Sequence, residues 1–171
     1  KEPVFRPPSE ARSLLIQATE GCTYRCTFCY PYLKKKFKIR KLEDIKKDID
    51  AGATIYGPRS VKKIFLLDGN AFVMKPQMLI DISEYCFKVH KNLQRVSAYT
   101  HAKDVLRKSP EDLKKIAEAG LTLVYLGIET GEDELLQKIN KQTTSDEIVQ
   151  ASKKLYEAGI TLSGTVILGL A

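Results

Sequence analysis

The chain has 171 residues, of which 43% are hydrophobic and 29% are charged, and its formal net charge is +7. This length suits one domain, and the composition is that of a globular protein, which excludes disorder, a collagen-like repeat and a disulfide scaffold. A membrane span needs about 18 consecutive apolar residues, and the sequence has no such stretch, so we expect no membrane partner. No basic and apolar leader opens the sequence, so a cytoplasmic location is expected.

Short β-rich runs alternate with longer stretches whose apolar residues recur at helical spacing. In chain order, the expected strands cover residues 13–19, 63–68, 96–100, 121–128 and 161–168. The expected helices contain residues 42–49, 79–87, 113–117 and 148–155. Ser109 and Thr144 are typical N-cap residues for the last two helices, and Gly120 and Gly159 are typical stop signals after them.

The alternation of strands and helices predicts βαβ units, and hence an α/β fold with a parallel sheet. Functional residues in such folds lie at the carboxyl ends of the strands, in a barrel and in an open sheet alike. Five strands do not close a barrel, and the sequence ends in an apolar run at residues 167–171. We therefore expect a single domain over residues 1–171 that is truncated at its C-terminus. The proline-rich first dozen residues are expected to form an extended lead-in.

Three of the four cysteines follow the first expected strand, with the spacing Cys-x3-Cys-x2-Cys. A structural zinc site would need a fourth ligand from a distant and unpaired Cys or His. A thioredoxin-like pair of Cys26 and Cys29 would leave Cys22 unused. The third interpretation is an iron–sulfur cluster, in which three thiolates leave one of four irons open to an exchangeable ligand, as catalysis requires.

The cysteine spacing, with the aromatic Phe28 just before the third cysteine, resembles the signature of the radical S-adenosylmethionine (radical SAM) superfamily. The resemblance covers residues 13–169 and points to the broad group of coproporphyrinogen-oxidase-like and Elongator-like oxidoreductases. It implies a partial TIM-like (βα)6 barrel of parallel strands, of which this chain supplies about five βα units. It also implies that Cys22, Cys26 and Cys29 bind a [4Fe–4S] cluster. Reduction of that cluster would cleave SAM to a 5′-deoxyadenosyl radical, which abstracts hydrogen from a substrate.

The same resemblance implies SAM-binding roles for residues after the later strands. Gly69 and Asn70 stand where the family has Gly-Gly-Glu, and Asn70 keeps a carbonyl acceptor for the methionine ammonium without the charge. The carboxylate of Glu129 is expected at the ribose hydroxyls. The backbones of Ile167 and Phe28 are expected on either side of the adenine.

Several further residues have weaker signals. Ser97 or Tyr99, on the third strand, would touch the SAM ribose or the substrate, and Lys141 stands where the family often has an arginine at the SAM carboxylate. His101 would reach the pocket, but a single pocket histidine gives no basis for an acid–base role. Two other residues are expected to be structural: Cys86 in the core and His90 at a helix end.

Two functions from different classes are compatible with these features. The first is a radical SAM enzyme that receives electrons from a flavodoxin- or ferredoxin-like donor and acts on a small molecule or on RNA. The second is a non-enzymatic iron–sulfur or zinc protein that binds nucleic acid through the basic run at residues 34–41. Iron, sulfide and zinc analysis distinguishes the two.

Overall fold

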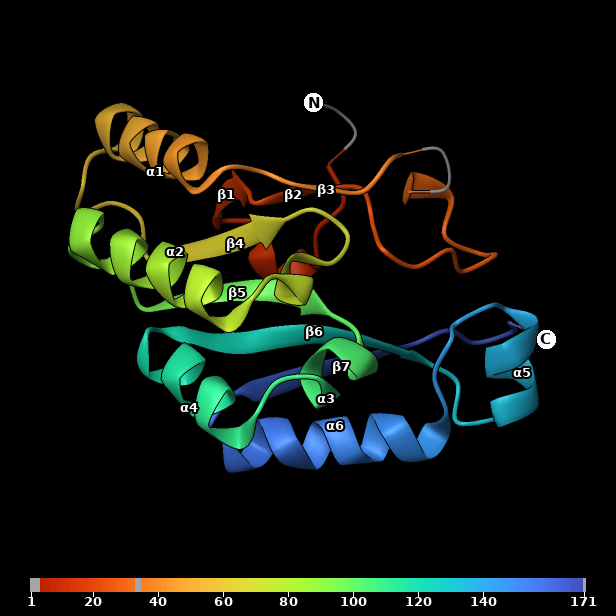
Figure 1. Ribbon diagram of the computed structural model, residues 1–171. Coiled ribbons are helices and arrows are strands. Elements are labelled where there is room, and N and C mark those ends of the chain that lie inside the picture. Colours follow the sequence, from red (N-terminus) through yellow and green to blue (C-terminus); the bar gives the residue numbers. More distant parts are fainter. Residues whose placement is uncertain (1–3, 33–34, 171) are drawn as a thin grey trace.

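The computed structural model describes residues 4–32 and 35–170. Its centre is a five-stranded sheet in which every neighbouring pair is parallel and the strand order is β1-β4-β5-β6-β7. The strands are β1 (Leu14–Gln17), β4 (Lys63–Leu67), β5 (Arg95–Thr100), β6 (Leu121–Glu129) and β7 (Thr161–Val166). The expected α/β fold with a parallel sheet is confirmed, and each strand lies beside the next one along the chain (Figure 1).

The longer helices connect successive strands and follow one another along one face of the sheet (Figure 1). The described helices are α1 (Leu42–Tyr56), α2 (Pro76–Val89), α3 (Ala102–Leu106), α4 (Pro110–Glu118), α5 (Asp133–Lys138) and α6 (Ser145–Glu157). Ser109 and Thr144 cap α4 and α6 as expected, since their side chains accept hydrogen bonds from the backbone N–H groups of Asp112 and Glu147. No described helix has the length and apolar character needed to cross a bilayer.

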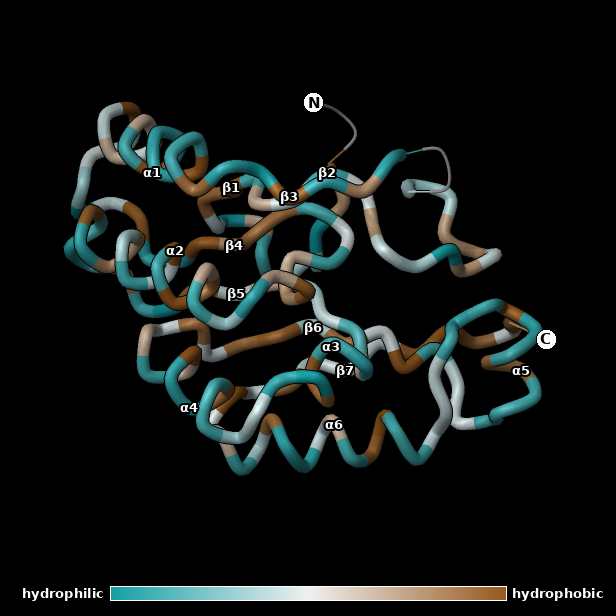
Figure 2. The backbone as a smooth tube through the Cα atoms, viewed as in Figure 1, coloured by the Kyte–Doolittle hydropathy of each residue, from teal (hydrophilic) through white to brown (hydrophobic). Residues whose placement is uncertain are grey.

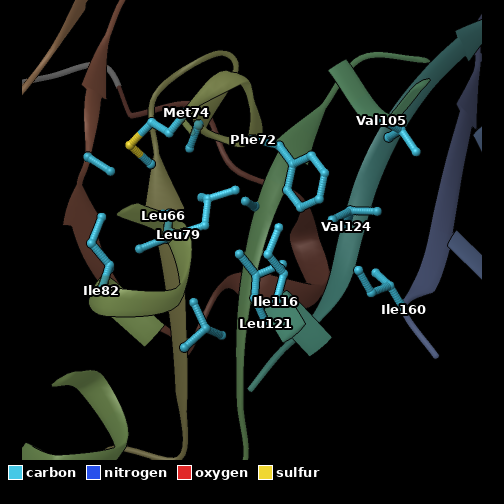
Figure 3. Packing of buried hydrophobic residues seen from close by; sticks show 14 of the residues in the cluster. Leu66, Phe72, Met74, Leu79, Ile82, Val105, Ile116, Leu121, Val124 and Ile160 are labelled. Carbon is cyan, nitrogen blue, oxygen red and sulfur yellow. The ribbon is translucent and has the colours of Figure 1, made fainter. Parts of the chain in front are cut away.

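The two faces of the sheet carry different side chains because successive residues of a strand point to opposite sides. The helix-covered face is aliphatic, and its packing against α2 and α4 is seen in Figure 3 through Leu66, Val124, Leu79 and Ile116, all fully buried. Figure 2 shows hydrophobic colour along β4 and hydrophilic colour on outward turns of the helices. This aliphatic layer packs the strands against the helices. Aromatic and polar side chains lie on the other face of the sheet.

The opposite face of the sheet is aromatic and polar. The rings of Phe65, Tyr99 and Tyr125 meet edge to face there, with centroids 5.1 Å apart for Phe65–Tyr99 and 6.0 Å apart for Tyr99–Tyr125. The register places Tyr99 of β5 directly beside Tyr125 of β6, which brings the two rings together. The sheet thus has an inner face like that of an incomplete barrel, on which Tyr99 and Tyr125 lie two residues nearer the carboxyl ends of the strands than Phe65.

The N-terminal segment differs from the expected extended lead-in because it contains the 3-10 helix η1 (Pro8–Glu10), which carries a fully buried carboxylate. Glu10 accepts hydrogen bonds from Arg95 Nη2 (2.8 Å), Ser97 Oγ (3.0 Å) and the Tyr125 hydroxyl (2.6 Å), and from Ser13. Burial raises the pKa of Glu10, but these four hydrogen bonds outweigh it and lower the pKa below its usual value. The segment is therefore tied to β5 and β6.

The first expected strand is also shorter than residues 13–19. β1 ends at Gln17, and the chain then forms β2 (Thr19–Glu20), which pairs antiparallel with β3 (Lys38–Ile39) in a separate two-stranded sheet. The N–H of Arg40 donates to the carbonyl of Ala18 and draws the two segments together. The last strand ends at Val166 rather than at residue 168, and the Leu168 side chain is 93% exposed.

Candidate functional site

The three clustered cysteines lie in the loop after β2, at the carboxyl end of the parallel sheet. They line a cavity of about 150 Å³ together with residues from the ends of β5 and β6 and from the segments that follow β4 and α5. Eight of the residues singled out in the sequence for cofactor or metal binding line it: Cys22, Cys26, Phe28, Cys29, Gly69, Asn70, Glu129 and Lys141. The structure thus brings together groups from positions 22 to 141 of the chain.

The cysteine loop is held by its own backbone and by the segment after α5. The N–H of Cys29 donates to the carbonyl of Cys26 at 3.0 Å, and the N–H of Thr27 donates to the carbonyl of Ile139 at 2.9 Å. All three thiols are free, and burial raises the pKa of each above its usual value. Bound iron would overcome this cost, because a coordinating thiol is deprotonated by the metal.

The three sulfur atoms do not converge on a single ion. Among residues 4–32 and 35–170, no three Cys, His, Asp or Glu side chains are grouped closely enough to hold one metal ion. A four-iron cluster takes one thiolate per iron, so its ligands are spread around the cluster instead of meeting at one point. The donor set, three free thiols on one loop, fits such a cluster.

Glu129 and Lys141 form an ion pair in the wall of the cavity. Lys141 Nζ lies 2.8 Å from Glu129 Oε1, and the two side chains are 8% and 9% exposed. Glu129 has a positive φ of 63°, which turns its side chain back beside Gly127. A Cβ at position 127 would clash with Glu129 Oε1 and lie 2.7 Å from Lys141 Nζ, so a larger residue there would displace the ends of these two side chains. Lys141 is buried by this pairing, although an isolated lysine in a sequence is usually a surface charge.

Asn70 follows β4 and is 1% exposed. Its amide Nδ2 donates to Asp104 Oδ2 at 2.7 Å and to Thr23 Oγ1 at 3.2 Å. Its carbonyl oxygen, Oδ1, is buried and has no hydrogen-bond partner in the described part of the chain. A buried acceptor without a partner is costly, so a ligand that donates a hydrogen bond here would relieve that cost.

His101 occupies the cavity wall as a neutral imidazole. Its ring stacks on that of Tyr24, with centroids 3.6 Å apart, and Nε2 lies 2.9 Å from the carbonyl oxygen of Lys141. Nδ1 accepts from the N–H of Lys103, so the proton resides on Nε2. Burial lowers the pKa of His101 to about 4. The residue reaches the pocket as expected, and its contacts fix the segments that carry Tyr24 and Lys141.

Gly69 lies against Tyr32, where a Cβ would approach the ring carbon Cε2 to 2.7 Å. Tyr32 belongs to the 3-10 helix η2 (Tyr30–Tyr32), and its ring meets Phe5 edge to face with centroids 6.3 Å apart. The hydroxyls of Tyr24 and Tyr32 are buried without hydrogen-bond partners among the described residues. These two tyrosines and Asp104 are the neighbours that sequence reasoning missed. The sequence did contain one signal for the two tyrosines, because both lie within or directly after the cysteine motif.

Two of the predicted cofactor-binding residues do not line the cavity. Of the alternatives Ser97 and Tyr99, Tyr99 lines the cavity, whereas the Ser97 hydroxyl donates to Glu10 and is fully buried in the middle of the sheet. Ile167 lies beside the site through its backbone, since its N–H donates to the carbonyl of Glu129 at 3.0 Å, and the residue is 37% exposed. Cys86 is a fully buried residue of α2, as expected, and His90 is fully buried at the end of that helix.

The comparisons with known proteins agree with this geometry. The sequence model described as the radical SAM superfamily matches residues 16–170. The chain is 26% identical over 157 residues to an uncharacterized methyltransferase of Pyrococcus horikoshii, covering 91% of this chain and 32% of that protein. It is also 26% identical over 165 residues to the anaerobic magnesium-protoporphyrin IX monomethyl ester cyclase of Rubrivivax gelatinosus, covering 95% and 28%.

Solved structures show the same fold. The cobalamin-dependent radical SAM enzyme OxsB, with aqua-cobalamin and SAM bound, superposes with a TM-score of 0.72 at 24% identity, over 91% of this chain and 24% of that one. The radical SAM methyltransferase TsrM of Kitasatospora setae gives a TM-score of 0.67 at 19% identity, over 90% and 30%. These structures support the partial TIM-like barrel.

The chain belongs to the radical SAM superfamily, a class of enzymes that use a [4Fe–4S] cluster and SAM. It spans about a third or less of the two curated relatives described above. The cavity fits such cofactors, because it combines three free thiols with the buried and unpartnered Asn70 Oδ1.

Proposed function

We propose that residues 1–171 are the core domain of a longer radical SAM enzyme, in which Cys22, Cys26 and Cys29 hold the [4Fe–4S] cluster. The observation that carries this proposal is that all three thiols line one cavity with polar groups from later strand ends. When bound, the cluster and SAM supply a 5′-deoxyadenosyl radical that abstracts hydrogen from the substrate. The protein's own contribution is to bind, to orient and to exclude water.

The remaining residues bind different parts of the SAM molecule. The carbonyl of Asn70 accepts from the methionine ammonium, with Gly69 beside it, and Lys141 lies near the carboxylate. Glu129 accepts from the ribose hydroxyls, and the backbones of Phe28 and Ile167 flank the adenine. Supporting this division are the unpartnered Asn70 Oδ1 and the backbone hydrogen bond that joins Ile167 to Glu129.

Electrons reach the cluster from a flavodoxin- or ferredoxin-like protein that docks on the basic segment after the cysteines. Four lysines of this segment are exposed: Lys35, Lys36, Lys38 and Lys41. Arg25 joins it to the cysteine loop, since its guanidinium donates to the carbonyls of Lys35 (3.1 Å) and Cys22 (2.7 Å). Such a positive surface attracts an acidic donor. Lys34, part of the predicted basic run, lies outside the described residues.

The substrate is a small molecule or a segment of RNA. The three cluster ligands are proposed to remain reduced thiols before iron binds, which suits the cytoplasm rather than an oxidising compartment.

Cysteine substitution tests the proposal in the complete protein, prepared without oxygen and reconstituted with iron and sulfide. We expect a brown protein that releases 5′-deoxyadenosine from SAM when reduced with dithionite. Cys22→Ala, Cys26→Ala and Cys29→Ala should each lose the cluster and this release, because three thiolates are needed to leave a single open iron.

Cys86→Ala is the matched control, because this fourth cysteine is fully buried in α2. Its variant should keep the cluster and the release of 5′-deoxyadenosine. Zinc without iron or sulfide in the wild-type protein, or equal losses in the Cys86 variant, would contradict the proposal.

A further inference from the structure

Asn70 stands where the family resemblance expects a glutamate, and the structure shows what surrounds the replacement. The amide is fixed from one side, since Nδ2 donates to both Asp104 Oδ2 and Thr23 Oγ1. An ionised carboxylate accepts hydrogen bonds and donates none, so it selects the amide nitrogen and turns the oxygen away from itself. Asn70 Oδ1 is therefore held as the unpartnered atom of a residue that lines the cavity.

Asp104 carries the charge that Asn70 lacks. It lies in α3 directly behind Asn70, is 2% exposed and does not itself line the cavity. Its other oxygen, Oδ1, lies 3.2 Å from Arg107 Nη1, but the Arg107 side chain is 68% exposed. That exposed partner is screened by water, whereas the Asn70 amide is buried against the carboxylate. A negative charge thus lies one hydrogen bond behind the cavity wall.

We propose that Asp104 is the positioning residue for the SAM ammonium: it fixes the Asn70 amide with Oδ1 toward the ligand and supplies, through that amide, the negative charge of the missing glutamate. Asn70 and Asp104 together replace one carboxylate with a hydrogen-bonded pair, in which the neutral member touches the ligand. The inference rests on the proposed function, because the ligand is the ammonium of SAM bound in this cavity.

The test measures binding to the complete, cluster-reconstituted protein by titration calorimetry. The ligands are SAM and the SAM analogue in which the α-amino group is replaced by hydrogen. Asp104→Asn removes the charge and lets the Asn70 amide reverse. We expect it to weaken SAM binding about 10-fold to 100-fold, the range for a hydrogen bond to a charged group, and to leave the desamino analogue within about threefold. Iron and sulfide content should be unchanged.

The exchange variant Asn70→Asp/Asp104→Asn provides the sharper comparison. It keeps one carboxylate and one amide within hydrogen-bond distance but places the charge on the residue that touches the ligand. We expect it to restore the affinity for SAM to within about threefold of wild type. Glu111→Gln, which removes an exposed acid in the first turn of α4, is the matched control and should leave the affinity unchanged.

A purely structural role for Asp104 predicts a different pattern. Equal weakening of SAM and the desamino analogue, loss of iron in Asp104→Asn, or failure of the exchange variant to restore SAM binding would each overturn the inference. Failure of the wild-type protein, with its cluster intact, to bind SAM would instead overturn the proposed function itself. The two failures are therefore distinguished by which protein shows them.

Discussion

Glu129 and Lys141 are two charged side chains that the fold removes almost completely from water. Each would pay a large desolvation cost alone, and the 2.8 Å contact between them offsets it. Gly127 leaves room for the pair in its present position, because a Cβ there would meet the carboxylate of Glu129 and displace it. The pair also joins the end of β6 to the segment after α5, so it shapes the cavity wall as well as carrying charge.

Replacing the lysine alone should be far more damaging than replacing both members. Lys141→Met leaves the Glu129 carboxylate buried without its partner, and we expect a loss of about 3–5 kcal/mol in the free energy of unfolding. The double variant Glu129→Gln/Lys141→Met should lose much less. Urea unfolding of the cluster-free protein measures both values.

The exposed pair of Lys47 and Asp44 on α1 provides the control, since their side chains are 77% and 48% exposed. Lys47→Met should change the free energy of unfolding by less than about 0.5 kcal/mol. If Lys141→Met cost no more than Lys47→Met, the buried pair would have no special role in stability.

At the scale of elements, α6 begins with a complete capping box. The Thr144 side chain accepts from the N–H of Glu147, and the Glu147 side chain accepts from the N–H of Thr144 at 3.1 Å. Thr144→Ala should therefore lower the free energy of unfolding by about 1 kcal/mol. Thr54→Ala, at an exposed position inside α1, should be neutral or slightly stabilising, because alanine has the higher helix propensity. Equal effects at both positions, measured by urea unfolding, would rule out the cap as the cause.

The elements that sequence reasoning identified are those with long periodic patterns or explicit end signals. α4 and α6 have both, with Ser109 and Thr144 at their starts. α3, which spans five residues, is too short to show a 3.6-residue period, and β2 and β3 contain two residues each. Their existence depends on tertiary contacts, such as the hydrogen bond from Arg40 to Ala18. Glu10 was missed for the same reason, since three of its four partners, Arg95, Ser97 and Tyr125, lie 85 or more positions away in β5 and β6.

At the scale of the whole molecule, the arrangement of the parallel sheet explains why the residues of the candidate site were easier to predict than the contacts that support them. In a parallel sheet the carboxyl ends of all strands meet at one edge, so Cys22, Asn70 and Glu129 were expected to converge. Pairing within the site, as between Asn70 and Asp104, depends on side-chain directions that spacing does not encode. Of the alternatives Ser97 and Tyr99, which share one face of β5, only Tyr99 lines the cavity. Ser97 lies two residues further from the carboxyl end of the strand, where its hydroxyl donates to Glu10.

Acid should destabilise the fold through its two histidines. His101 is 4% exposed with a pKa lowered by burial from 6.5 to about 4, and burial also lowers the pKa of His90. Between pH 6.5 and about pH 4, the His101 imidazole is protonated in the unfolded chain and neutral in the folded chain. The free energy of unfolding therefore falls as the pH drops below 6.5. For His101 alone the loss is about 2 kcal/mol at pH 5 relative to pH 8.

Urea unfolding of the cluster-free protein at pH 8 and pH 5 measures this loss without interference from acid decomposition of a cluster. His101→Asn keeps a residue suited to the N-cap of α3 but does not titrate, and His90→Leu fills a site where neither ring nitrogen has a hydrogen-bond partner among the described residues. Each variant should lose less stability than wild type between the two pH values, and the double variant least. An identical loss in wild type and double variant would show that groups other than the two histidines cause the acid sensitivity. Glu10 does not contribute in this range, because its lowered pKa makes its contribution disappear only at still lower pH.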